Sequence, residues 1–126
     1  MVIGIIGVLV SLAMVSYTSA QRKSRDSRRQ ADMKAIQGAL EVYYSENSYV
    51  YPAVVGGSCA SAVAYMKSSW PVDPVNSGTL VYTQDCDTST VYCVCAKLEV
   101  AGKGNASSTA CGWGGTKTHY CVGSLQ

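Results

Sequence analysis

Six cysteines are the residues of this 126-residue chain with the most evident chemistry. An even number of cysteines in a short chain is typical of a disulfide framework formed in an oxidising compartment. Cys93 and Cys95 stand two residues apart in an expected strand, so their side chains point to the same face. Zinc sites usually separate two cysteines by two to four residues, so we favour three disulfides over a metal. The cysteines therefore predict a domain that lies outside the cytoplasm.

The pairing of these cysteines cannot be read from their spacing alone. We expect one disulfide to close the C-terminal loop, one to cross a hairpin, and one to tie the loop after the first helix to the sheet. These pairs are Cys111–Cys121, Cys86–Cys93 and Cys59–Cys95. Each disulfide would stabilise the domain by roughly 2–4 kcal/mol.

Other candidate chemistry is sparse. The only histidine, His119, lies in an expected strand, and nothing in the sequence marks a nucleophile beside it. Calcium binds oxygen ligands, so Asp85 and Asp87, together with Asp73, are an alternative metal site. The triplet at 105–107 matches a glycosylation acceptor, and we expect it to be unmodified. We expect no metal, no cofactor and no enzymatic activity.

The element that must position the rest is the uncharged run Met1–Ala20. A bilayer core is crossed by about 20 apolar residues, so this run is long enough to span one. No glycine or proline follows between Gln21 and Ile36, so nothing in that stretch ends a helix. The spacing of the apolar residues after it predicts one helical stripe that packs on a sheet, and one helix from Met1 to about Ser45. The stripe is Met33, Ile36, Leu40 and Tyr43.

The net charge is only +2, but basic residues gather just after the apolar run. Between residues 21 and 34 the basic residues are Arg22, Lys23, Arg25, Arg28, Arg29 and Lys34, against Asp26 and Asp32. The spacing of Arg22 to Asp26 and of Arg28 to Asp32 allows ion pairs along the helix, each worth about 0.2–0.5 kcal/mol. We interpret these charges as a solvated helix face, with an ion-pair belt between subunits as the alternative. DNA binding is a third interpretation, because clustered basic residues neutralise phosphates.

The remainder predicts a small antiparallel sheet. β-branched and aromatic residues mark three strands, and a turn-forming cluster at 85–89 joins the first two into a hairpin. A short helix over Cys59–Ser68, with Ser58 as its N-cap, precedes the sheet. The expected strands are 79–84, 90–100 and 116–122. The fold class is α+β, with segments 1–20 (apolar helix half), 21–46 (amphipathic helix half) and 47–126 (globular head).

The N-terminal segment resembles that of bacterial type IV pilins and type II secretion pseudopilins. The residues that carry the resemblance are 3–9 (IGIIGVL), 11–14 (SLAM), 25–32 (RDSRRQAD), 36–44 (IQGALEVYY) and Tyr51-Pro52. The order of these segments is specific, and it covers about the first 52 residues. The resemblance implies a pilin fold, with a long helix packed on a disulfide-braced sheet of three to four strands.

It also implies a function. The chain would be a pilin that polymerises with itself into an extracellular filament on the bacterial surface, and we expect it to be the major subunit. Such filaments serve adhesion, twitching motility or DNA uptake, with DNA or surfaces as partners. Before assembly the chain would lie in the inner membrane and meet the prepilin peptidase and the pilus assembly machinery. The residues expected to pack in the filament core are Val2, Ile3, Ile5, Ile6, Val8, Leu9, Leu12 and Met14, and Gly4 and Gly7 are candidates for a local melting of the helix.

The chain also departs from the family. The basic leader and the characteristic glutamate do not precede Met1, so we expect Met1 to be an interior residue of a longer precursor. Val15 stands where the family carries a proline. Two functions remain as alternatives: a pseudopilin of a type II secretion system, and a monomeric, membrane-anchored binding domain. A secretory signal peptide is the rival interpretation of residues 1–20.

Overall fold

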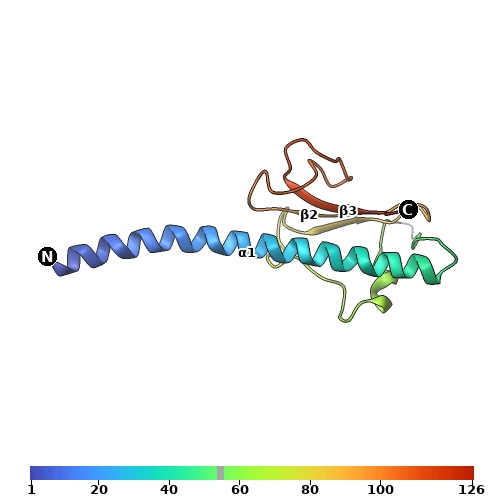
Figure 1. The fold of residues 1–126 in the computed structure, drawn as a ribbon, viewed down its shortest axis with the longest axis horizontal. Helices are drawn as coiled ribbons and strands as arrows, with labels where there is room; N and C mark the ends of the chain where they lie inside the picture. Colours follow the sequence, from blue (N-terminus) through green and yellow to red (C-terminus); the bar gives the residue numbers. More distant parts are fainter. Residues whose placement is uncertain (54–55) are drawn as a thin grey trace.

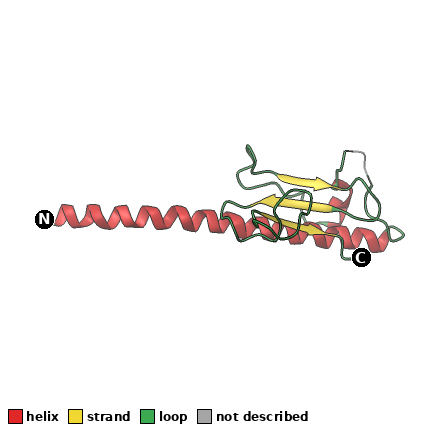
Figure 2. Ribbon diagram, turned by 90° about the horizontal axis from the view of Figure 1, so that it is seen from above, coloured by secondary structure: helices red, strands yellow, loops and turns green. Residues whose placement is uncertain are grey.

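The computed structural model describes residues 1–53 and 56–126. A long helix, α1 (Val2–Glu46), is followed by a short 3₁₀ helix, η1 (Ala60–Tyr65), and by three strands. The strands are β1 (Tyr82–Asp85), β2 (Cys93–Lys97) and β3 (His119–Gly123). The sheet and its loops lie along the second half of α1, while the first half of α1 extends away from them (Figures 1 and 2). The expected α+β class, with a long helix on a small antiparallel sheet, is confirmed.

The helix α1 has 45 residues and is therefore about 67 Å long. It ends at Asn47, whose backbone N–H and side-chain amide both donate to the carbonyl of Tyr43, at 2.9 and 2.8 Å. Ser48 and Tyr49 then take φ angles of 59°, in the left-handed region. That conformation stops the helical hydrogen-bond ladder and turns the chain back toward the sheet.

The sheet has the order β1-β2-β3 with antiparallel pairs, so the predicted hairpin is confirmed. The strands are shorter than expected and begin later. Residues 79–81 are excluded from β1 because a tight turn, in which the Leu80 N–H donates to the Ser77 carbonyl, precedes it. The expected helix at 59–68 forms only as η1, whose N-cap is Cys59 rather than Ser58. The Ser58 hydroxyl still accepts the N–H of Ala60, at 3.4 Å.

One apolar core joins the helix to the sheet. Met33, Ile36 and Leu40 of α1 are completely buried, as the stripe predicted, and they cluster with Val94 of β2. Tyr43 is the exception to the stripe, because it is only half-buried. Its ring packs edge-on against Tyr65 of η1, with ring centroids 5.7 Å apart. Tyr43 therefore lies at the edge of the same core, where it also contacts the 3₁₀ segment.

The disulfides are Cys59–Cys86, Cys93–Cys111 and Cys95–Cys121, so all three expected pairs are wrong. The reason is the two-residue alternation of the strands. Asp85 faces Cys93 across the hairpin, so Cys86 points to the helix side and Cys93 to the outer side. On the helix side, the N–H of Cys86 bonds the carbonyl of Gly57, which brings Cys59 close.

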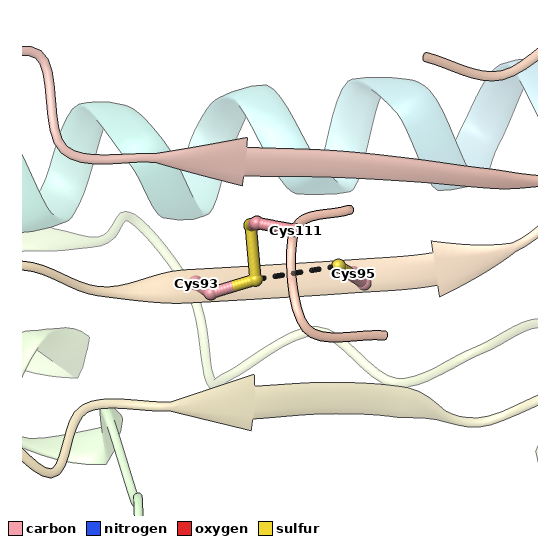
Figure 3. A group of neighbouring side chains, drawn as sticks. All are labelled: Cys93, Cys95 and Cys111. Atoms are coloured by element: carbon pink, nitrogen blue, oxygen red, sulfur yellow. Dashed lines mark hydrogen bonds between the residues drawn. A yellow bond between two sulfur atoms is a disulfide. The ribbon is translucent and has the colours of Figure 1, made fainter. Parts of the chain in front are cut away.

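On the outer face, the register sets Cys95 opposite Cys121, and their Cα atoms are 4.1 Å apart. Cys93 is opposite Gly123, so it bonds instead to Cys111 in the loop that crosses the sheet (Figure 3). The prediction that Cys93 and Cys95 share a face is confirmed, because their sulfurs lie 3.5 Å apart.

The loop over the outer face is held by backbone contact with β3. The side-chain oxygen of Asn105 accepts a hydrogen bond from the N–H of Cys121, and the side-chain amide of Asn105 donates to the carbonyl of Cys121, both at 2.8 Å. Gly104 lies so close to the backbone of β3 that a β-carbon there would overlap the carbonyl of His119. This close approach accounts for a glycine at that position.

Candidate functional site

The first candidate site is the apolar half of α1. Its large side chains are exposed; Ile3 is 87% exposed and Leu9 61%. All eight residues predicted for a filament core share this exposure: Val2, Ile3, Ile5, Ile6, Val8, Leu9, Leu12 and Met14. Single exposed apolar residues are ordinary on soluble proteins, but a contiguous apolar surface of this size marks a membrane or protein contact.

Two hydroxyl groups of this half bond within the helix. The hydroxyls of Ser11 and Thr18 donate to the carbonyls of Val8 and Val15, at 2.8 and 3.0 Å. A helix that meets its own hydrogen-bonding needs can enter an apolar environment at little cost. By length and composition α1 can cross a membrane, although a signal sequence at an N-terminus passes the same test.

Gly4 and Gly7 are both helical, and a β-carbon at either position would meet open space. Beside Gly4, a shallow hollow of about 360 Å³ is lined by Met1, Ile5 and Val8, among others. Small residues on such a helix let a second helix approach its backbone closely. Melting at these glycines stays a prediction for an assembled state.

The second candidate site is a buried ionic cluster where the head first meets α1. Its centre is Arg29, whose side chain is completely buried. The guanidinium donates two parallel hydrogen bonds to Asp73, at 2.6 and 2.9 Å, and one to Asp26 at 2.7 Å. A fourth, at 2.8 Å, goes to Glu99. The fork of two parallel bonds is the strong geometry for arginine and a carboxylate.

Each carboxylate of the cluster has further donors. Asp26 accepts the backbone N–H groups of residues 99 and 100, both at 2.9 Å. Asp73 accepts the N–H of residue 75 at 2.8 Å. Glu99 accepts two bonds from Arg25, at 2.6 and 2.7 Å. The cluster thereby ties one helical turn of α1 to two loops of the head.

The pKa values of the cluster follow from these bonds. The hydrogen bond from Arg25, assisted by Arg29 and opposed by burial, lowers the pKa of Glu99 to about 2. Burial alone would raise the pKa of Asp73, but hydrogen bonds from Arg29 and the backbone outweigh it and lower that pKa. The bond to Asp73 is the largest cause of the raised pKa of Arg29. Arg29, Asp73 and Glu99 are therefore charged at neutral pH.

This arrangement corrects the predicted role of the basic stretch. Asp26 pairs with Arg29 rather than with Arg22, and Asp32 accepts the hydroxyl of Tyr82 at 2.6 Å rather than pairing with Arg28. Within residues 1–53 and 56–126, every ion pair involves Arg25 or Arg29. Asp26, Arg29 and much of Arg25 are therefore internal, and only Arg22 and Arg28 remain as the expected surface charges.

Sequence reasoning missed this cluster, although a signal was present. Arg29 lies four residues before Met33 and Asp26 lies seven before it, so both continue the buried stripe of α1 by two turns. A charged residue on the buried face of a helix requires a partner. Asp73 and Glu99, far along the chain, could not be chosen as that partner from spacing.

A second polar centre lies near the other end of the head. Glu41 of α1 accepts the hydroxyls of Tyr51 and Tyr92, each at 3.0 Å, and the N–H of Leu125 at 3.3 Å. Burial, followed by the carboxylate of Glu41, raises the pKa of Tyr51 to about 12. The same two causes raise the pKa of Tyr92. The contact holds both phenols protonated and anchors the C-terminal end on the helix.

The structure does not assemble the alternative metal sites. The sulfurs of Cys93, Cys95 and Cys111 lie within 4.8 Å of one another, but each belongs to a disulfide and carries no thiolate for a metal (Figure 3). Asp73 is engaged by Arg29, while Asp85 ends β1 on the exposed surface, so Asp73 does not join the other expected calcium ligands.

His119 is half-buried in β3, and its Nδ1 lies 2.9 Å from the hydroxyl of Thr118. Burial and the neighbouring Lys97 lower its pKa. The ring is therefore neutral at pH 7 and forms part of the strand packing.

Comparison with known proteins identifies no relative of this chain. No family model matches the chain, and neither a curated protein nor a solved structure matches it at a significant level.

Proposed function

We propose that this chain is a structural subunit of the type IV pilin kind, which polymerises with copies of itself through the apolar half of α1. The observation that carries the proposal is the continuity of α1. One 45-residue helix joins an exposed apolar half to a half that is packed on the sheet. The apolar half is apolar all round, so burial on every side requires lipid or several neighbouring helices.

The length of the helix favours assembly over simple anchoring. An anchor needs only about 20 residues to cross a bilayer and no rigid connection to its head. Here α1 continues without a break into the head, and the ionic cluster around Arg29 begins within about ten residues of the end of the apolar half. Such a junction fixes the head at a set position relative to the apolar half, which a regular polymer of identical subunits requires.

The disulfides support an extracellular location. All six cysteines are paired, and no free cysteine remains. Reducing compartments keep thiols reduced, so a chain built on three disulfides suits the cell exterior. In the proposed cycle the apolar half lies in the inner membrane first and moves into the filament core on assembly.

The test is to shear cells that make the chain, pellet the supernatant, and examine it by electron microscopy and mass spectrometry. Long thin filaments in which this chain dominates are the expected result. Ile5→Lys and Leu9→Lys, which place a charge on the apolar half, should abolish the filaments, while Val72→Lys on the exposed head surface should not. A chain that stays in the membrane fraction as a monomer in detergent would refute the proposal and favour the anchored binding domain. Short periplasmic assemblies would favour the pseudopilin.

A further inference from the structure

Three acidic residues of the head are exposed and unpaired among the described residues. Of the eight acidic residues, four belong to the two polar centres, and a fifth, Asp32, accepts the hydroxyl of Tyr82. The three others are exposed and form no ion pair within residues 1–53 and 56–126: Glu46, Asp85 and Asp87. Glu46 ends α1, and Asp85 ends β1 at the same end of the head. Unpaired charges gathered at one end create a field that attracts an opposite charge.

Asp85 and Asp87 line a groove of about 460 Å³ together with Tyr92 and Trp113. Trp113 is 60% exposed, although it is held by a β-bridge to Ala106. Carboxylates beside an exposed indole are suited to a cationic side chain, because a guanidinium or ammonium can pair with the acid and lie over the ring. We call this site the acidic groove.

The opposite end of the head carries a basic cluster. Lys23 and Lys103 line a common hollow with Val100, and Arg22 lines the adjoining hollow, in which Val100 also takes part. All three side chains are exposed. We call Arg22, Lys23 and Lys103 the basal cluster.

The separation of the two sites along α1 can be worked out, because the groove residue Tyr92 is bonded to the helix. Tyr92 of the acidic groove bonds Glu41, which is 18 residues after Lys23 along α1. At about 1.5 Å per residue, the two sites are roughly 27 Å apart along the axis. They cannot neutralise each other within one chain, but a second copy shifted along the axis by that distance brings them together.

We propose that the acidic groove of one copy receives the basal cluster of a second copy. The contact is head-to-tail, and a contact of this kind repeats without closing, which generates a filament rather than a dimer. The two different surfaces also give the polymer a direction. The inference deepens the proposed function and rests on it, because it names the head surfaces that join subunits already held by their apolar helices.

Carbodiimide crosslinking tests the contact directly, because the reagent joins a carboxylate to an amine with no spacer. Cells that make the full chain are switched to isotope-labelled medium during expression, so that labelled and unlabelled copies share one inner membrane before assembly, and sheared filaments and membranes are both treated. The expected product links Asp85 or Asp87 to Lys23 or Lys103 with mixed isotopes. The axial separation of roughly 27 Å excludes the same link within one copy.

Charge reversal provides the second measurement. Lys23→Glu with Lys103→Glu should lower the filament yield about tenfold or more, because like charges placed opposite each other cost several kcal/mol. Asp85→Lys with Asp87→Lys should do the same, and the four changes together should restore assembly. The matched control is Arg28→Glu with Lys34→Glu, which changes the net charge equally on exposed residues outside both sites.

The outcomes separate the two proposals. Wild-type filaments without the link, or reversal variants that assemble as well as the control, would overturn the head-to-tail contact and leave the pilin function standing. Absence of wild-type filaments would refute the proposed function; the link in membranes would then still support the contact, and its absence there would overturn it.

Discussion

Replacing Arg29 with methionine should be among the most damaging single changes in the head. Methionine keeps much of the volume of the arginine stem but removes the charge and four hydrogen bonds. Asp73, whose side chain is completely buried, would keep only its backbone donors and lose its cation. The change therefore leaves a buried charge without compensation instead of a simple cavity.

The expected cost is about 3–5 kcal/mol, which is typical when one partner of a buried ion pair is removed. The lower half of that range is favoured, because Glu99 keeps both bonds from Arg25 and Asp26 keeps two backbone donors. A domain is stable by about 5–15 kcal/mol in total, so the variant would still fold but with a strongly reduced margin.

Urea unfolding of the full chain in detergent, monitored by the fluorescence of half-buried Trp70, measures the difference in the free energy of unfolding. Arg28→Met, one residue away and exposed, is the matched control and should change stability by no more than about 0.5 kcal/mol. The deficit of Arg29→Met should shrink as the pH falls, because protonation relieves the stranded carboxylates. If both variants unfold alike, or if the deficit is independent of pH, the cluster does not hold the head as argued.

Other perturbations should show smaller, equally specific effects. Gly104→Ala should destabilise the head by about 1–3 kcal/mol, because the added β-carbon overlaps the backbone of β3. Gly38→Ala, in open space on α1, should stabilise it by about 0.5–1 kcal/mol. Thermal unfolding measures both changes. Cys59→Ser with Cys86→Ser should cost about 3 kcal/mol by urea midpoint, and an unchanged midpoint would contradict this. The pKa of Glu99 is about 2 in the folded chain, against an ordinary 4.5, so the unfolded chain binds more protons between these pH values. The contribution of Glu99 to stability is therefore present above about pH 4.5 and is lost toward pH 2. Glu99→Gln should be less stable at pH 6, and its deficit should narrow across that window.

The long helix was predictable because its signals are local. An uncharged run, the lack of glycine and proline after it, and a repeating apolar stripe placed its ends within about a residue of Val2 and Glu46. The hairpin was equally local, since a turn-forming cluster separates two β-rich stretches. Each of these elements depends on neighbours a few residues apart along the chain.

The disulfides and the ionic cluster were not predictable because each depends on contacts between distant segments. A shift of one residue in a strand reverses the face on which a cysteine points, and that choice sent Cys86 to the helix side. Local spacing favoured Arg22 and Arg28 as helix partners for nearby acids. Tertiary contacts to Asp73 and Glu99 outweighed those weak pairs.

The position of the ionic cluster links stability to the proposed assembly. Asp26 and Arg29 are the first buried residues along α1, so the turn of α1 that leaves the head is held by charge as well as by apolar packing. An apolar contact can slide with little penalty, whereas a guanidinium fork fixes both rotation and translation of the helix. Loss of Arg29 should therefore loosen the head relative to the apolar half before the rest of the core opens. Hydrogen exchange should show this as faster exchange at residues 99–103 in Arg29→Met, with the amides of β2 still protected at the same time.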